Sequence, residues 1–397
     1  MRKCPVIMRF IYISIICLIL LPACTKCDAV NQENSEVNEP EKEVTIDEIY
    51  EKWQRATEIA ASLDDRLLAA QVLISGIEGK GSLNSNIVSL LSEFPAGGIM
   101  LFKYNLDTDN DSIRALINQT ATLVNGEAGI PPFIAVDHEG GTVNRFRRGT
   151  ADLPDASSYL EMPLEPDDHW ALAKIEADSL KAGRVLKDLG INVNFAPVAE
   201  YLNDSNRAFL SRRSYGSDPY FTALASMYFI RGMNASGILC VIKHFPGIAG
   251  ADPHYSSSVI NGDKAELDKL VYPFKYLIDN EYARAIMVSH SAVPAMDTKI
   301  ASLSGIVMKD WLKDDLCFLG LLIADDFSMA AAGSLSPEEA AVRSIAAGAD
   351  MVLVWPKDLR RTHSAILYAL YAGRLSRERL REAAEQIIFE KIYMGLM

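Results

Sequence analysis

The residues best able to do chemistry lie in one short segment, Lys243 to His254, which directly follows an apolar run at 238–242. The segment holds a lysine, two histidines and an aspartate between prolines and glycines. Such residues on a loop after a strand are typical of a catalytic loop on a rigid scaffold. His254 could move a proton near neutral pH, and Asp252 could accept from its other ring nitrogen. The alternative is a loop histidine with no role.

A loop of this kind needs a scaffold, and the chain repeats short apolar runs separated by amphipathic segments. We expect strands at 71–77, 97–102, 132–137, 191–197, 238–242, 285–290, 321–325 and 350–355. Expected helices include 111–125, 170–189, 218–236, 264–280 and 337–347, and the tail from 375 should form closing helices. Parallel strands need such crossovers, and eight units are the count of an α/β fold of the (β/α)8 TIM-type barrel, here as a single domain. A doubly wound open sheet with insertions is the alternative.

Polar and charged residues follow several of these strands, and in a barrel the strand ends face one common site. They include Asp137 and Arg145 after the third strand, Arg213 after the fourth, Lys243 and His244 after the fifth, His290 after the sixth and Asp325 after the seventh. Carboxylates accept from hydroxyls, and Lys, Arg and His donate to them, so this set would suit a sugar. Any one of them could instead cap its strand or form a salt bridge.

Asp325 follows the apolar pair Ile323-Ala324, and a carboxylate in this setting can act as a nucleophile on an anomeric carbon. Most retaining glycosidases pair such a nucleophile with a second carboxylic acid. Asp326 would point to the opposite face of a strand, so we expect it to be a structural hydrogen-bond acceptor. That leaves His254 to donate to the leaving oxygen and then to activate water.

These segments resemble glycoside hydrolase family 3, in its single-domain β-N-acetylglucosaminidases (β-hexosaminidases). Lys243 to His254 resembles the family's KHFPG…D-x-H signature, and residues 320–329 resemble its nucleophile motif. Further similarities lie at 101–105 (LF-x-x-N), 137–141 (D-Q-E-G-G), 195–198 (FAPV) and 213–215 (R-S-Y). The resemblance runs in order from about residue 60 to 390.

The resemblance implies a role for each matching residue. Asp325 would form a covalent glycosyl-enzyme, His254 would be the general acid/base and Asp252 its partner. The N-acetylglucosamine ring would be bound by Asp137, Arg145, Arg213, Lys243 and His244. Ile248-Ala249 stand where the family usually has His-Gly, and the loop is shorter. We therefore expect a mobile flap that hinges at 248–251 and an altered aglycone preference.

The N-terminal residues form a separate unit. A basic start and an apolar run at 11–21 end in Leu21-Pro22-Ala23-Cys24, which predicts a secretory signal over 1–23. The sequence resembles a bacterial lipobox, so Cys24 is the expected lipid attachment site. Plain secretion and an uncleaved anchor are alternatives. Residues 24–45 are rich in Glu and Asn and predict a disordered tether.

The catalytic domain is expected to span 46–397, and Thr45 to Glu48 resemble a capping box at its first helix. The chain is 49% hydrophobic and 23% charged, as soluble globular proteins are. Its net charge of −13 would repel phosphate backbones, so no nucleic acid partner is expected. Cysteine and histidine spacing gives no metal-ligand pattern, and the chemistry requires no cofactor.

Together these features predict a retaining, exo-acting β-N-acetylglucosaminidase, a monomer tethered by its lipid to a bacterial membrane in the cell envelope. Its substrates would be peptidoglycan fragments or other GlcNAc-containing oligosaccharides. A phosphorylase is an alternative, because an imidazole would not repel phosphate as a carboxylate would. A catalytically silent lipoprotein that binds glycans is a second alternative.

Overall fold

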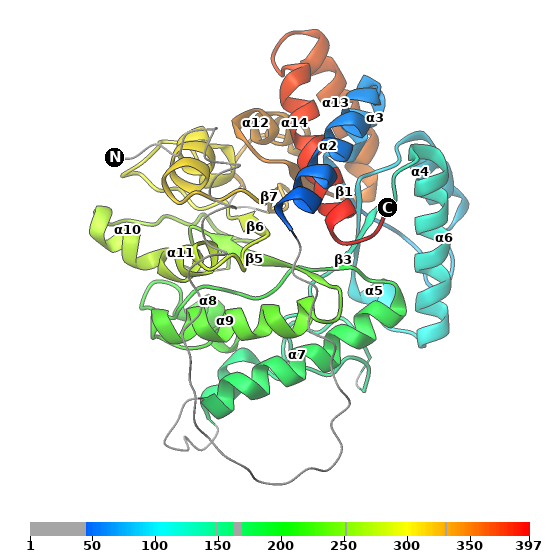
Figure 1. Ribbon diagram of the computed structural model, residues 1–397. Helices are drawn as coiled ribbons and strands as arrows, with labels where there is room; N and C mark the ends of the chain where they lie inside the picture. The colour runs from blue at the N-terminus through cyan, green and yellow to red at the C-terminus, as the bar shows by residue number, and fades with distance from the viewer. Residues whose placement is uncertain (1–44, 148, 162–168, 251, 330–331) are drawn as a thin grey trace.

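Eight parallel strands close into a barrel in the computed structural model, which describes residues 45–397 except 148, 162–168, 251 and 330–331 (Figure 1). The strands are β1 (Leu73–Gly76), β2 (Gly98–Leu101), β3 (Phe133–Val136), β4 (Val193–Asn194), β5 (Leu239–Phe245), β6 (Ala285–Val288), β7 (Leu321–Ala324) and β8 (Met351–Val354). They pair in sequence order, and β1 pairs with β8 to close the ring. The predicted (β/α)8 barrel is therefore confirmed, and the open sheet is excluded.

Helices surround the barrel and connect successive strands (Figure 1). They are α2 (Ile46–Ser62), α3 (Asp65–Gln71), α4 (Ser85–Glu93), α5 (Lys103–Leu106), α6 (Asn110–Ala128), α7 (His169–Leu189), α8 (Arg207–Leu210), α9 (Pro219–Asn234), α10 (Lys264–Leu270), α11 (Tyr272–Asp279), α12 (Pro337–Ala347), α13 (Pro356–Tyr371) and α14 (Arg377–Tyr393). Shorter helical segments are η2 (Ala156–Leu160), η3 (Ser211–Arg213) and η4 (Ala301–Leu303), and η5 (Ile306–Asp315) is π-helical. The strands are buried along their whole length, as expected where helices cover a parallel sheet.

Several local predictions were wrong. Gln71, expected in the first strand, belongs to α3, and the strand expected over 191–197 is only Val193–Asn194. The helix expected over 264–280 is two helices, because Pro273 cannot donate a backbone hydrogen bond and lies in the first turn of α11. The fifth strand does not end at Ile242 but continues to Phe245. Lys243 and His244 are therefore residues of β5 and not of the loop that follows it.

The first and last helices, α2 and α14, pack against each other (Figure 1, blue and red). The predicted capping box begins α2: the Glu48 N–H donates to Thr45 Oγ1 at 3.2 Å, and the Thr45 N–H donates to Glu48 Oε2 at 2.9 Å. The rings of Trp53 on α2 and Phe389 on α14 lie 4.9 Å apart. Thr57 also donates to Glu385, so polar and apolar contacts join the two helices.

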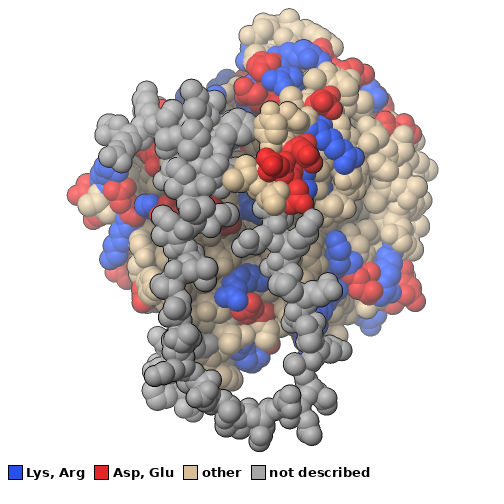
Figure 2. All heavy atoms as spheres, in the orientation of Figure 1, with Lys and Arg blue, Asp and Glu red and all other residues tan. Residues whose placement is uncertain are grey.

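Acidic and basic side chains occur in small, mixed groups on the face drawn in Figure 2. Among the surface ion pairs, Arg343 Nε lies 2.8 Å from Glu339 Oε1, but exposed pairs contribute little to stability. Within the described part of the chain, no helix has both the length and the apolar character needed to cross a membrane. The signal at 1–23 and Cys24 lie outside the described residues, as does the tether up to residue 44.

Candidate active site

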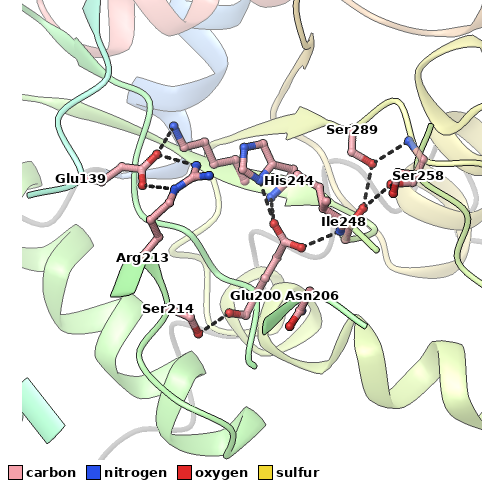
Figure 3. A network of polar contacts seen from close by, with 12 residues as sticks. Glu139, Glu200, Asn206, Arg213, Ser214, His244, Ile248, Ser258 and Ser289 are labelled. Carbon is pink, nitrogen blue, oxygen red and sulfur yellow. Dashed lines mark hydrogen bonds and ion pairs between the residues drawn. The ribbon is translucent and has the colours of Figure 1, made fainter. Parts of the chain in front are cut away.

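A cluster of charged side chains, of which Lys243 and Glu139 are buried and the others partly buried, lies at the carboxyl ends of β3, β4 and β5. Lys243 Nζ on β5 lies 2.7 Å from Asp137 Oδ1 and 2.7 Å from Glu139 Oε1. Arg213, in η3, grips Glu139 with two parallel hydrogen bonds of 2.8 and 2.9 Å (Figure 3). Arg145 Nη2 approaches Asp137 Oδ2 at 3.4 Å. Four of the predicted sugar-binding residues thus belong to one network.

The network holds its charges in spite of burial. Burial works to raise the pKa of Asp137, but attraction to Lys243 and Arg145 lowers that pKa below its ordinary value. Burial works the other way on Lys243, but Asp137 and Glu139 raise its pKa. The pKa of Glu139 is likewise lowered, because Lys243 and Arg213 outweigh the effect of burial. The site therefore presents fixed cations and carboxylates to a polar ligand at neutral pH.

His244 is held by Glu200, a buried carboxylate that follows β4 (Figure 3). Glu200 Oε1 lies 2.7 Å from His244 Nδ1 and accepts from the His244 N–H at 3.2 Å. A carboxylate acceptor places the ring proton on Nδ1, and Nε2 has no partner among the described residues. Glu200 was not predicted as a site residue, although a carboxylate shortly after the FAPV segment was a usable signal.

The base of the loop after β5 is firmly anchored. Glu200 Oε2 also accepts from the Ile248 N–H at 2.6 Å, and Ser258 Oγ accepts from the Ala249 N–H at 2.9 Å (Figure 3). The Gly250 N–H donates to the Ser205 carbonyl at 2.6 Å, and Ile248 and Ala249 are buried. These contacts hold residues 248–250 in the described conformation, the hinge predicted at 248–251 stays a prediction, and Ala251 lies outside the described residues.

Asp252 and His254 form the predicted contact on this loop. His254 Nδ1 lies 2.6 Å from Asp252 Oδ1, which also accepts from the His254 N–H at 2.9 Å. Their side chains are 41% and 59% exposed, so a ligand can reach His254 Nε2. Partial burial works to raise the pKa of Asp252, but the His254 donors and the charge of Arg213 lower it. Because the charge of Arg213 acts on Asp252, this loop lies within electrostatic range of the charged cluster.

Asp325 follows β7, where its N–H donates to the Val288 carbonyl at 3.2 Å. Its Oδ1 accepts from the Asp326 N–H at 2.8 Å. His290, after β6, donates from Nε2 to the Asp326 carbonyl at 2.9 Å and has Ser302 Oγ 2.7 Å from Nδ1. Burial lowers the pKa of His290, and Asp325 opposes that shift in part. His290 is therefore neutral beside the Asp325 carboxylate.

Asp326 is the structural hydrogen-bond acceptor that we predicted. Its Oδ2 accepts from Trp355 Nε1 at 2.8 Å and from Ser328 Oγ at 2.7 Å, and its Oδ1 accepts from the Ser328 N–H at 2.8 Å. These contacts leave Asp326 fixed beside Asp325. Trp355 belonged to the eighth apolar run, and its sequence context gave no sign of this contact.

The predicted site residues therefore fall into connected groups at one end of the barrel. Asp137, Arg145, Arg213 and Lys243 share one network, and Glu200 links His244 to the loop base. His244, Asp325 and Asp326 all act on the pKa of His290, which places His290 between the β5 and β7 sides. Glu139, Glu200 and Trp355 are additions that the sequence alone did not assign to the site.

Comparison with known proteins gives a consistent result. The model of the glycosyl hydrolase family 3 N terminal domain matches residues 63–389. The β-hexosaminidase of Stenotrophomonas maltophilia is 30% identical over 295 residues, which cover 72% of this chain and 84% of the relative. That of Methylococcus capsulatus is 33% identical over 266 residues, which cover 65% of this chain and 75% of the relative.

Solved structures agree with the sequence relatives. A glycoside hydrolase family 3 β-N-acetylglucosaminidase from Paenibacillus has a TM-score of 0.78 at 26% identity; the match covers 84% of this chain and 63% of the Paenibacillus protein. A β-N-acetylhexosaminidase from Beutenbergia cavernae has a TM-score of 0.74 at 26% identity. The match covers 84% of this chain and 99% of the Beutenbergia protein. The chain belongs to glycoside hydrolase family 3. Within that family it is a glycoside hydrolase of the β-hexosaminidase group.

Proposed function

We propose that the chain is an exo-acting, retaining β-N-acetylglucosaminidase that removes terminal GlcNAc from peptidoglycan fragments or other GlcNAc-containing oligosaccharides. The observation that carries the proposal is the 2.6 Å contact between His254 Nδ1 and Asp252, on a loop anchored beside the charged cluster. The relatives are β-hexosaminidases, and the Paenibacillus structure is that of a β-N-acetylglucosaminidase. No metal or organic cofactor takes part in the chemistry proposed below.

In the first step Asp325 attacks the anomeric carbon while His254 Nε2 protonates the leaving oxygen. The glycosidic C–O bond breaks, a carboxylate ester to the sugar forms, and His254 becomes neutral. In the second step His254 takes a proton from water, the hydroxide attacks the anomeric carbon, and Asp325 is released. Two displacements at one carbon restore the original configuration. Asp252 holds the orientation of the His254 ring through the contact with Nδ1.

The charged cluster supplies the proposed hydrogen bonds to the sugar ring. Lys243, Arg213 and Arg145 offer N–H donors, Asp137 offers acceptor oxygens, and His244 offers Nε2. Because the ion pairs already fix these side chains, the ligand has little ordering to do when it binds. Ionic side chains of both signs can satisfy several ring hydroxyls at once.

The test is hydrolysis of aryl β-GlcNAc substrates by wild type, Asp325→Asn and His254→Ala. Asp325→Asn should lose turnover by at least about a thousand-fold with every leaving group. His254→Ala should lose about a hundred-fold with poor leaving groups and much less with activated ones, which need no protonation. Asp315→Asn, at an exposed aspartate, is the matched control and should keep wild-type rates. Equal rates in all four proteins would refute the proposal.

Phosphorolysis is the second candidate, because an imidazole acid/base would not repel a phosphate acceptor as a carboxylate would. The β-glucoside phosphorylase BglX shares the fold at 22% identity with a TM-score of 0.74. Adding inorganic phosphate to the assay separates the two reactions. Sugar 1-phosphate as the main product would favour the phosphorylase, and free GlcNAc at all phosphate concentrations would favour hydrolysis.

We also propose that the enzyme is held in the cell envelope by a lipid on Cys24. The support is the sequence alone, where an apolar run ends in Leu21-Pro22-Ala23-Cys24. Expression in bacteria with a clickable fatty acid should label wild type but not Cys24→Ser. Label retained in Cys24→Ser would refute the lipid site.

A further inference from the structure

Three aromatic rings stack at the carboxyl ends of β8 and β2. The rings of Trp355 and Phe102 lie 4.8 Å apart at 9°, and those of Phe102 and Tyr104 lie 5.7 Å apart at 17°. Tyr104 donates its hydroxyl to the Ile77 carbonyl at 2.9 Å, which fixes the outer ring. This aromatic stack thus extends from Trp355 to the half-exposed Tyr104.

The stack crosses over β1, which lies between β8 and β2 in the barrel. β1 ends in Gly76, and a Cβ atom there would lie 2.9 Å from Phe102 Cε2 and 3.2 Å from Pro356 Cδ. A side chain on β1 would therefore push into Phe102. The glycine lets rings from two strands that are not neighbours meet face to face.

The indole N–H of Trp355 points away from the stack to Asp326. Its Nε1 lies 2.8 Å from Asp326 Oδ2 and 3.1 Å from Ser328 Oγ. The backbone N–H of Asp326 donates to Asp325 Oδ1 at 2.8 Å, and its carbonyl accepts from His290. Trp355 is therefore two hydrogen bonds from the carboxylate of Asp325, and the aromatic stack determines where its N–H points.

We propose that Trp355 is a positioning residue for Asp325, held by the aromatic stack and acting through Asp326. The proposal rests on the nucleophilic role proposed for Asp325. The Trp355 hydrogen bond to the Asp326 carboxylate fixes the peptide whose N–H orients Asp325 Oδ1. Hydrogen bonds to a charged acceptor are strong, so losing this one should disturb the geometry of attack.

The decisive variant is Trp355→Phe, which keeps a ring for the stack but removes the N–H. The probe is a fluorinated N-acetylglucosaminyl fluoride that traps glycosyl-enzymes, and mass spectrometry identifies the labelled residue. We expect Trp355→Phe to slow saturated labelling of Asp325 about ten-fold, with little change in the half-saturating concentration. In an Asp326→Ala background, which has no side-chain acceptor for the indole, the same change should add little, because the pathway is already broken. Trp170→Phe, at an exposed tryptophan on α7, is the matched control and should label like wild type.

Thermal unfolding identifies any variant that has lost its fold, and Trp355→Tyr, which also keeps a ring without the indole N–H, then serves as a second test. Labelling of Trp355→Phe at the wild-type rate would overturn the proposal. So would a raised half-saturating concentration with an unchanged maximal rate, because that result means that the indole contacts the sugar. An undiminished effect in the Asp326→Ala background would also overturn it. Wild-type label on a residue other than Asp325 would overturn the proposed function, and the positioning role with it.

Discussion

Two lysines lie buried at opposite ends of the same barrel, and their surroundings differ. Lys243, at the carboxyl end of β5, is 4% exposed and contacts two carboxylates at 2.7 Å. Lys391 on α14 is fully buried near the strand starts, where its Nζ meets Gln71 Oε1 at 3.0 Å and the Phe133 ring at 5.0 Å. Carboxylates raise the pKa of Lys243, whereas burial lowers the pKa of Lys391 to about 7.

The difference shows what burial alone does to a cation and what a ligand site adds. At the base of the barrel the ammonium loses hydration without gaining an opposite charge, so its neutral form becomes accessible. At the site end Lys243, Asp137 and Glu139 have partners of opposite sign, which shift the pKa of each toward its charged form. Fixed charges are useful where a polar ligand binds, and they cost free energy anywhere else.

The strongest test of this difference is to make the same substitution at each of the two lysines. Lys243→Met leaves Asp137 and Glu139 as adjacent buried carboxylates without their shared cation, so the free energy of unfolding should fall by about 3–5 kcal/mol. Lys391→Met removes no ion pair and should change it by about 1 kcal/mol or less at pH 7. Urea unfolding measures both. Similar losses in the two variants would contradict the distinction between the two ends.

The pH dependence of Lys391→Met gives the next largest effect. Unfolded Lys391 holds its proton up to about pH 10.5, but the folded protein releases it near pH 7. Raising the pH within this window therefore favours the folded wild type, and lowering the pH toward 7 removes that stability. Between pH 7 and 9 the wild type should gain roughly 2 kcal/mol over Lys391→Met. A constant difference across this range would show that Lys391 keeps its charge.

Arg213→Lys sharpens the comparison within the charged cluster. The cation remains, but the paired hydrogen bonds to Glu139 cannot both be made by an ammonium. We expect a loss of about 1–2 kcal/mol in the free energy of unfolding. KM for an aryl β-GlcNAc should also rise, because Arg213 is a proposed sugar ligand. Unchanged stability would mean that the positive charge matters at this position and that the two parallel hydrogen bonds do not.

The smallest effect on stability is expected at the exposed dyad. Asp252→Ala removes a partner of His254 whose own side chain is more than half exposed, so unfolding should change by about 0.5 kcal/mol or less. Turnover of substrates with poor leaving groups should nevertheless fall by roughly ten-fold or more. A large loss of stability with unchanged turnover would show that Asp252 supports the fold and not the catalytic step.

The barrel could be predicted from the sequence because each strand is a short, continuous apolar run, a local property. The contact of Asp252 with His254 was equally accessible, since the two residues are only two positions apart in the sequence. Glu200 was harder to find because its partner His244 lies 44 positions away along the chain. The break at Pro273 was a local signal, and amphipathic spacing on both sides of it obscured the boundary.

Trp355 shows the limit of sequence reasoning most clearly. It closes an apolar run, and its indole could equally have packed in the core. Only the closed barrel brings it to Asp326, 29 positions earlier, and only the missing side chain of Gly76 lets it stack on Phe102. Contacts of this kind depend on which strands become neighbours, and that is a property of the closed ring.

The packing of α2 on α14 has a mechanical consequence. A pull on the chain at Thr45 enters the domain through α2, whose contacts with α14 include Trp53 on Phe389. Both helices lie outside the ring of strands, so this force acts first on the side chains packed between α2 and α14. For an enzyme tethered on the N-terminal side, this helix contact would be the first part of the domain to bear tension.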